Sequence, residues 1–252
     1  MTQREYPDKP SEVYFFGTCL VDLFYPEAGL AGMQLIHREG VRVVFPPDQS
    51  CCGQPAYNSG YLDEARRVAR AQIELFAEPW PVVVPSASCA ATMRFHYPDL
   101  FAGEPLHAQA IALSERVYEL TEFLLHVLRI ELQDRGEPLR VANHTSCTGR
   151  RKLGVAGAAE QLLSQLDRVE YVEQERADEC CGFGGTFAVK YPEISAAMVS
   201  DKADAIEQSG ADLLIGGDCG CLMNIGGHLC KRGSQLSAQH IAQFLWERTR
   251  DE

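Results

Sequence analysis

The chain has 252 residues, of which 46% are hydrophobic and 23% charged, as in a globular protein with one large core or two smaller ones. Its net charge of -12 argues against a nucleic-acid partner, because phosphate contacts need a basic surface. The opening segment 1–11 is polar, so we expect no secretion leader. No apolar run approaches the roughly 20 residues of a membrane span. Together these features predict a cytoplasmic protein without a transmembrane segment.

Short apolar runs alternate with longer helical patterns along the chain. Strands are expected at 13–16, 41–45 and 82–84, and again at 140–142, 169–172 and 213–215. Helical patterns cover 27–38, 62–76, 157–166 and 194–208, and the apolar stretch 117–132 is predicted to be a core helix. Alternation of this kind predicts an α/β fold with mostly parallel sheets flanked by helices.

The cysteines show that the chain is an internal duplication. Of ten cysteines, eight form two series with matching spacing: Cys19, Cys51, Cys52 and Cys89, then Cys147, Cys180, Cys181 and Cys221. Equivalent members lie 128 to 132 residues apart, and a glycine follows each Cys-Cys doublet. We therefore predict two tandem pseudo-symmetric α/β units over 12–132 and 139–250, joined by the polar, turn-prone segment 133–139.

Each series of cysteines follows the predicted strands of its repeat. In an open parallel sheet, ligands bind beyond the carboxyl ends of the strands, so residues distant in sequence converge there. Four thiolates per repeat are thus expected to face one site. Clustered cysteines in a chain without a secretion leader indicate metal ligands or redox thiols more than structural disulfides.

Iron-sulfur clusters and zinc both suit four thiolates. Structural zinc usually uses two C-x(2–4)-C pairs, and two adjacent cysteines scarcely bind one zinc tetrahedrally without strain. A multi-iron cluster spreads its ligand positions over several metal atoms, so the spacing favours iron and sulfur. Glycines after the doublets, Gly53 and Gly182, allow backbone amides to approach the sulfurs.

The arrangement resembles the CCG cysteine-rich domain family, found in tandem in the cysteine-rich subunit of heterodisulfide reductase and in the glycolate oxidase iron-sulfur subunit. Segments 180–187 (CCGFGGTF), 190–195 (KYPEIS) and 220–227 (GCLMNIGG) are most similar to the lactate-utilization branch of that family. The resemblance implies an electron-carrying subunit that acts in the oxidation of L-lactate to pyruvate. It also implies two further lactate-utilization subunits as partners, at least one of them an iron-sulfur protein.

The family signature ends in C-x-x-C, but Ser86 and Asp218 stand where the first cysteine is expected. The simpler expectation is therefore one four-cysteine [4Fe-4S] cluster per repeat, in place of the noncubane clusters that the resemblance to heterodisulfide reductase implies. Cys219 is either a fifth ligand in the second repeat or a spare thiol. Zinc remains the alternative metal, in a zinc-stabilised or metal-free scaffold, and the vicinal doublets also allow a thiol-disulfide oxidoreductase.

Three further observations concern residues outside this ligand set. Cys230 is expected in a polar loop as a free thiol. His144 lies near enough in sequence to Cys147 to tune a cluster, although an ordinary loop histidine is the simpler interpretation. The chain has no Walker, Rossmann or nucleophile-elbow motif, so no catalytic residue is assigned and the chain is expected to relay electrons.

Overall fold

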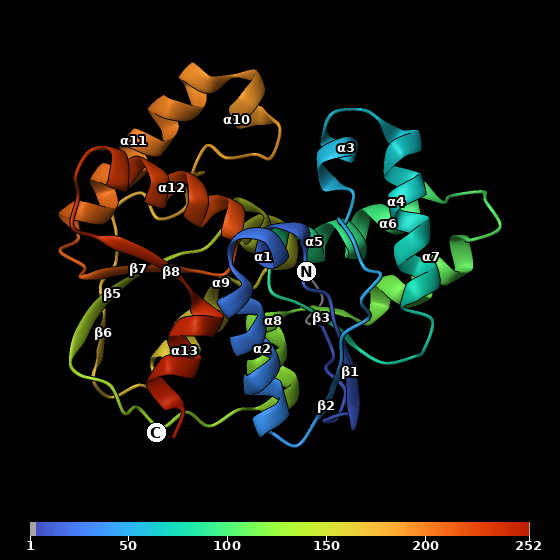
Figure 1. The fold of residues 1–252 in the computed structure, drawn as a ribbon, viewed down its shortest axis with the longest axis horizontal. Helices are drawn as coiled ribbons and strands as arrows, with labels where there is room; N and C mark the ends of the chain where they lie inside the picture. Colours follow the sequence, from blue (N-terminus) through green and yellow to red (C-terminus); the bar gives the residue numbers. More distant parts are fainter. Residues whose placement is uncertain (1–3, 252) are drawn as a thin grey trace.

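The computed structural model describes residues 4–251, so the first three residues of the polar opening segment lie outside the described part. Two four-stranded parallel sheets form the framework, with strand orders β2-β1-β3-β4 and β6-β5-β7-β8 (Figure 1). The strands are β1 (Glu12–Phe15), β2 (Arg42–Val44), β3 (Val82–Val84), β4 (Val117–Glu119), β5 (Leu139–His144), β6 (Val169–Tyr171), β7 (Leu213–Gly216) and β8 (Ser237–His240).

Helices connect the strands and cover the sheets. In the first repeat they are α1 (Cys19–Phe24), α2 (Pro26–Arg38), α3 (Gln54–Asn58), α4 (Leu62–Leu75), α5 (Ala87–Ala91), α6 (Tyr97–Leu100), α7 (His107–Glu115) and α8 (Leu120–Glu122). In the second they are α9 (Ala156–Leu163), α10 (Phe187–Lys190), α11 (Pro192–Gln208), α12 (Cys219–Lys231) and α13 (Ile241–Thr249). Turns of π-helix occupy Thr92–His96, Phe123–Leu128 and Gly149–Leu153. Among residues 4–251, no helix combines the length and apolarity needed to cross a bilayer.

The prediction of two tandem α/β units with parallel sheets is confirmed. Each sheet has a fourth strand that the sequence did not reveal, β4 or β8. The prediction of one core helix over 117–132 is wrong at its end, because the helical turns stop at Leu128 and Arg129 has a φ angle of +52°. It is also wrong at its start, because Val117–Glu119 pairs with β3 in parallel register. There the unpaired edge of β3 gains a ladder of hydrogen bonds, which outweighs the local helical pattern.

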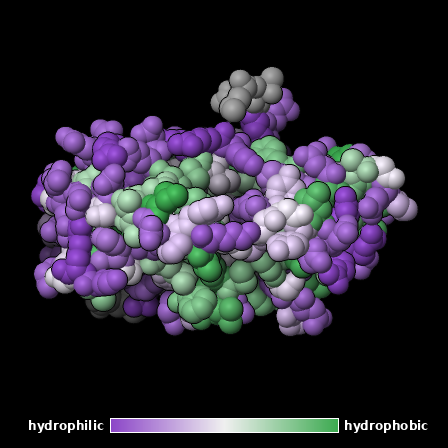
Figure 2. Space-filling model, turned by 90° about the horizontal axis from the view of Figure 1, so that it is seen from above, coloured by the Kyte–Doolittle hydropathy of each residue, from purple (hydrophilic) through white to green (hydrophobic). Residues whose placement is uncertain are grey.

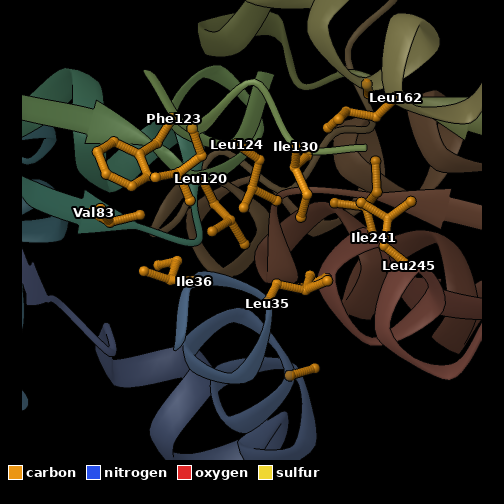
Figure 3. Close-up of a cluster of buried hydrophobic side chains, with 14 of the residues drawn as sticks. Leu35, Ile36, Val83, Leu120, Phe123, Leu124, Ile130, Leu162, Ile241 and Leu245 are labelled. Atoms are coloured by element: carbon orange, nitrogen blue, oxygen red, sulfur yellow. The ribbon is translucent and has the colours of Figure 1, made fainter. Parts of the chain in front are cut away.

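The two repeats share one hydrophobic core. Buried side chains from α2, α8 and the following π-helical turn meet others from α9 and α13 (Figure 3). Leu35, Leu124, Leu162 and Leu245 are all fully or almost fully buried in it. The core therefore ties the repeats together, and the ranges 12–132 and 139–250 remain a prediction for where each repeat begins and ends.

Helices α2 and α13, one from each repeat, lie side by side at the centre of the molecule (Figure 1). Polar contacts reinforce this junction near the C-terminus. Arg248 on α13 is buried and forms a two-pronged ion pair with Asp134, with Nε–Oδ1 and Nη2–Oδ2 distances of 2.7 and 2.6 Å. Its Nη1 also donates to the carbonyl of Glu137, so one side chain fastens α13 to the segment that joins the repeats.

Replacing Arg248 with Ala should lower the free energy of unfolding by about 3 kcal/mol, because the buried Asp134 carboxylate would lose its charged partner and keep only the backbone N–H groups of Gly136 and Arg168. Arg232→Ala is the matched control, since its ion pairs with Asp204 and Glu207 are on the surface and each is worth about 1 kcal/mol or less. Urea unfolding followed by circular dichroism measures both. Equal losses in the two variants would show that the ion pair between α13 and the joining segment stabilises the fold no more than an exposed ion pair does.

Candidate metal centre

In the first repeat, four cysteine side chains converge beyond the carboxyl ends of the strands. Cys19 begins α1 after β1, Cys51 and Cys52 lie in the loop between β2 and α3, and Cys89 lies on α5 after β3. The Cys52 and Cys89 Sγ atoms are 3.2 Å apart. A hydrogen bond with Cys51, together with burial, raises the pKa of the Cys19 thiol. The four sulfurs thus form one continuous group.

The second repeat reproduces this arrangement. Hydrogen bonds join Cys147 to Cys180 and Cys181 to Cys221, and the doublet itself is in contact. Burial follows the same order in both repeats. The first cysteine and the first member of the doublet are half-buried, whereas the second member and the last cysteine are buried. The duplication therefore extends from sequence spacing to the placement of each thiol.

Both groups of sulfurs line a single pocket of about 380 Å³. All eight cysteines of the two series contribute to its wall, together with Ser86, Ser88, Ser146 and Asp218 from the adjoining strand ends. The sequence predicted two separate points of convergence, one per repeat. The structure instead places the two points on one shared cavity, because the repeats pack with the ends of their sheets toward each other.

The glycines after the doublets let backbone amides approach the cysteine sulfurs, as predicted. Gly53 and Gly182 have φ angles of +87° and +82°, which residues with a side chain rarely adopt. Their backbone N–H groups donate to the Sγ atoms of Cys51 and Cys180, at 3.4 and 3.5 Å. Amides that point at the sulfurs favour negative charge there, as thiolate ligands require.

Asp218 and Ser88 join the two repeats at the pocket. The Asp218 carboxylate accepts hydrogen bonds from the Ser88 backbone N–H at 3.0 Å and from its hydroxyl at 3.3 Å. Burial raises the pKa of Asp218 above its usual range. The position that departs from the C-x-x-C signature therefore holds an inter-repeat contact.

His144 and Cys230 differ from their predicted placements. His144 is the last residue of β5 and is 1% exposed, so the interpretation as an ordinary loop histidine is wrong. The strand continues to this residue because His144 pairs with Gly216 of β7. Burial, Lys202 and Arg150 lower the pKa of His144 to about 3, so the ring is neutral. Cys230 is exposed, but it lies on α12 and not in a loop, because the helix continues through the two glycines before it.

Cys219 does not line the sulfur pocket, although it is buried. Burial, Asp218 and Cys89 of the other repeat raise the pKa of its thiol.

One indication in the sequence that His144 lies near the site was its position three residues before Cys147. That spacing did not show that the side chain is buried.

The residues present fit a metal centre of soft character. The pocket offers two sets of four thiols, and all eight cysteines are free of disulfides. In the second set, Cys181, Cys221 and His144 have ligand atoms within 4.8 Å of one another. Sulfur-only sets of this size suit iron-sulfur clusters or zinc, and a metal would displace the thiol protons on binding. Clustered cysteines of this kind can bind metal.

The fold and the pocket define a tandem cysteine-rich α/β protein. A family model described as "Cysteine-rich domain" (CCG) matches residues 13–94 and 141–226. Lactate utilization protein A of Geobacillus kaustophilus is 48% identical over 237 residues, which cover 93% of this chain and 98% of that one. The protein of the same name from Bacillus subtilis is 45% identical, with the same coverage. The chain belongs to the lactate utilization protein A family.

A solved structure of a hypothetical protein from Helicobacter pylori shares the fold. It superposes with a TM-score of 0.71 at 10% sequence identity and covers 99% of this chain and 51% of that chain. At this identity the similarity concerns the fold alone.

Substituting the doublet glycines should separate backbone strain from crowding. In Gly53→Ala the new Cβ would lie 3.5 Å from the nearest atom, so the left-handed φ is the main penalty, about 1 kcal/mol. In Gly182→Ala the Cβ would lie 2.8 Å from the Ser195 carbonyl oxygen, which forces the backbone to move. We expect a larger loss of unfolding free energy in Gly182→Ala, measured by urea titration of the metal-free protein. Equal losses would contradict a crowded doublet loop in the second repeat.

Proposed function

We propose that this chain carries electrons through two iron-sulfur clusters, one per repeat, as a subunit of a lactate-oxidising system. The observation that supports this most directly is the repeated thiol arrangement, with the same order of burial in each half. A scaffold protein with free thiols would have no need for four sulfurs at the same strand ends in both repeats. The substrate class comes from the relatives, whose name is lactate utilization protein A.

The proposed ligands are the two cysteine series. The first cluster would be held by Cys19, Cys51, Cys52 and Cys89, and the second by Cys147, Cys180, Cys181 and Cys221. Clusters of the [4Fe-4S] type, when bound, accept and release single electrons. The half-buried cysteine of each doublet lies toward solvent and the buried one toward the core, so each cluster would be partly shielded by protein.

The surface around the pocket suits a protein partner. Val189 lines the pocket and is 82% exposed, and Leu23 on α1, 68% exposed, lines a neighbouring hollow together with Cys19 and Cys51. Tyr191 and Ile194 add further exposed apolar area beside α10. Figure 2 shows apolar surface gathered in the middle of the face seen from above, with hydrophilic surface toward both ends. Exposed apolar groups beside a redox pocket favour docking of another subunit there.

The chemistry of lactate oxidation also calls for partners. Removing two electrons and two protons from a hydroxy acid needs an electron-pair acceptor, and no nicotinamide or flavin motif occurs in this sequence. We propose that two further lactate-utilization subunits, at least one of them an iron-sulfur protein, exchange electrons with this chain. L-lactate would then react elsewhere in the complex, with this chain as the relay.

Anaerobic reconstitution tests the cluster assignment. The wild-type chain should bind about eight iron and eight sulfide, as expected for two [4Fe-4S] clusters, and give an EPR signal on reduction. Cys52→Ser and Cys181→Ser should each lose about half of the iron, because each removes a buried ligand from one set. Cys230→Ser is the matched control and should retain all of it, since that thiol is exposed and outside the pocket.

Two results would overturn this proposal. Stoichiometric zinc without sulfide would identify a zinc-stabilised scaffold. Reversible oxidation of the vicinal doublets, with turnover of a small disulfide and no iron, would identify a thiol-disulfide oxidoreductase. Circular dichroism of the metal-free variants separates loss of ligand from loss of fold.

A further inference from the structure

His144 is a buried polar side chain without a hydrogen-bond partner in the described part of the chain. Its ring is 1% exposed, and neither Nδ1 nor Nε2 has a hydrogen-bond partner among residues 4–251. A ring nitrogen lies within 4.8 Å of the Sγ atoms of both Cys181 and Cys221. Leaving a buried donor or acceptor unpaired costs about 1–3 kcal/mol, so a partner from outside the chain is indicated.

The first repeat supplies an internal comparison. Phe16 lies three residues before Cys19, as His144 lies three residues before Cys147. Phe16 is fully buried and packs in the same cluster as Cys52 and Cys89. An apolar aromatic ring therefore occupies the equivalent sequence position, in the hydrophobic cluster that also contains two cysteines of the first set. In the second repeat, the His144 imidazole places two polar nitrogen atoms at the equivalent position. An apolar ring would suffice there if the position served packing alone.

One ring nitrogen of His144 has room for a water partner. His144 lines a cavity of about 30 Å³ together with Glu119, Asn143 and Thr145, a volume that accommodates one water molecule among polar groups. A neutral imidazole has one N–H donor and one acceptor nitrogen. With the acceptor paired to water, the N–H is available for the sulfurs of Cys181 and Cys221.

We infer that the His144 N–H donates a hydrogen bond to a sulfur of the second repeat's cluster and thereby raises its reduction potential above that of the first. This inference rests on the proposed function. A hydrogen bond to sulfur stabilises the more negative, reduced state of an iron-sulfur cluster. Phe16 has no donor for the first cluster. The positive charges of Lys202, which is buried, and Arg150, which is half-buried, lie near His144 and would also stabilise the more negative, reduced cluster. The two repeats would therefore differ in redox potential.

Redox titration of the reconstituted chain, followed by EPR, tests this inference. His144→Phe copies the first repeat and should lower the potential of one cluster. We expect a shift of about tenfold in its oxidised-to-reduced ratio, which is about 59 mV for a one-electron couple. The other cluster should keep its potential. His144→Gln keeps an N–H and should recover part of the shift.

Stability of the metal-free protein provides a second readout with a matched control. His240 is also fully buried, but its Nδ1 accepts from the Ala242 N–H and its Nε2 pairs with the Pro85 carbonyl, both at 3.1 Å. His240→Phe should therefore lower the melting temperature. His144→Phe should leave it unchanged or raise it, because it removes nitrogens that have no protein partner among the described residues.

The outcomes separate this inference from the proposed function. Full iron content with unchanged potentials in His144→Phe would overturn the inference and leave the cluster assignment standing. Loss of half of the iron would also overturn it, by showing that His144 ligates iron directly. A wild-type chain that binds no iron would overturn the proposed function itself.

Discussion

The sulfur pocket depends on a hydrophobic core that belongs to both repeats. Each parallel sheet brings its own cysteines to its carboxyl edge, but nothing in one sheet fixes where the other edge lies. The core does so, because α2 and α8 of the first repeat pack with α9 and α13 of the second. Eight thiols then line one cavity without any disulfide to hold them. Apolar burial remote from the sulfurs thus sets the geometry of the site.

Much of this arrangement could be predicted from the sequence, since the duplicated cysteines carry two independent signals. Their equal spacing indicated the repeat, and their positions after apolar runs indicated the strand ends. The fourth strand of each sheet, β4 or β8, was harder to detect. Strand β8 has the sequence SAQH, without the β-branched or aromatic residues that mark a strand, and β4 continues directly into helical turns. Both exist because β7 and β3 offer an unpaired edge, which is a tertiary effect.

The merging of two sites into one pocket could not be predicted, because it depends on how the repeats pack. The same holds for His144 and Cys230. Strand pairing with β7 extends β5 to His144 and buries it, and α12 continues through Gly226 and Gly227 despite the low helix propensity of glycine. Comparing the two repeats helps once the structure is known. The first repeat has the apolar Phe16 at the position of His144, so packing alone does not explain a polar side chain there.

The departure from the C-x-x-C signature gains a physical meaning from the contact between Asp218 and Ser88. Asp218 lies three residues before Cys221, and Ser88 immediately precedes Cys89, so their hydrogen bonds connect the last cysteine of one set with the last cysteine of the other. A cysteine at 218 would add a sulfur to one set but make no comparable bond to the other repeat. For the two proposed clusters, electron exchange would depend on a fixed separation between them. A buried carboxylate that accepts two hydrogen bonds from the opposite repeat supplies that constraint at the pocket wall, where the core no longer reaches.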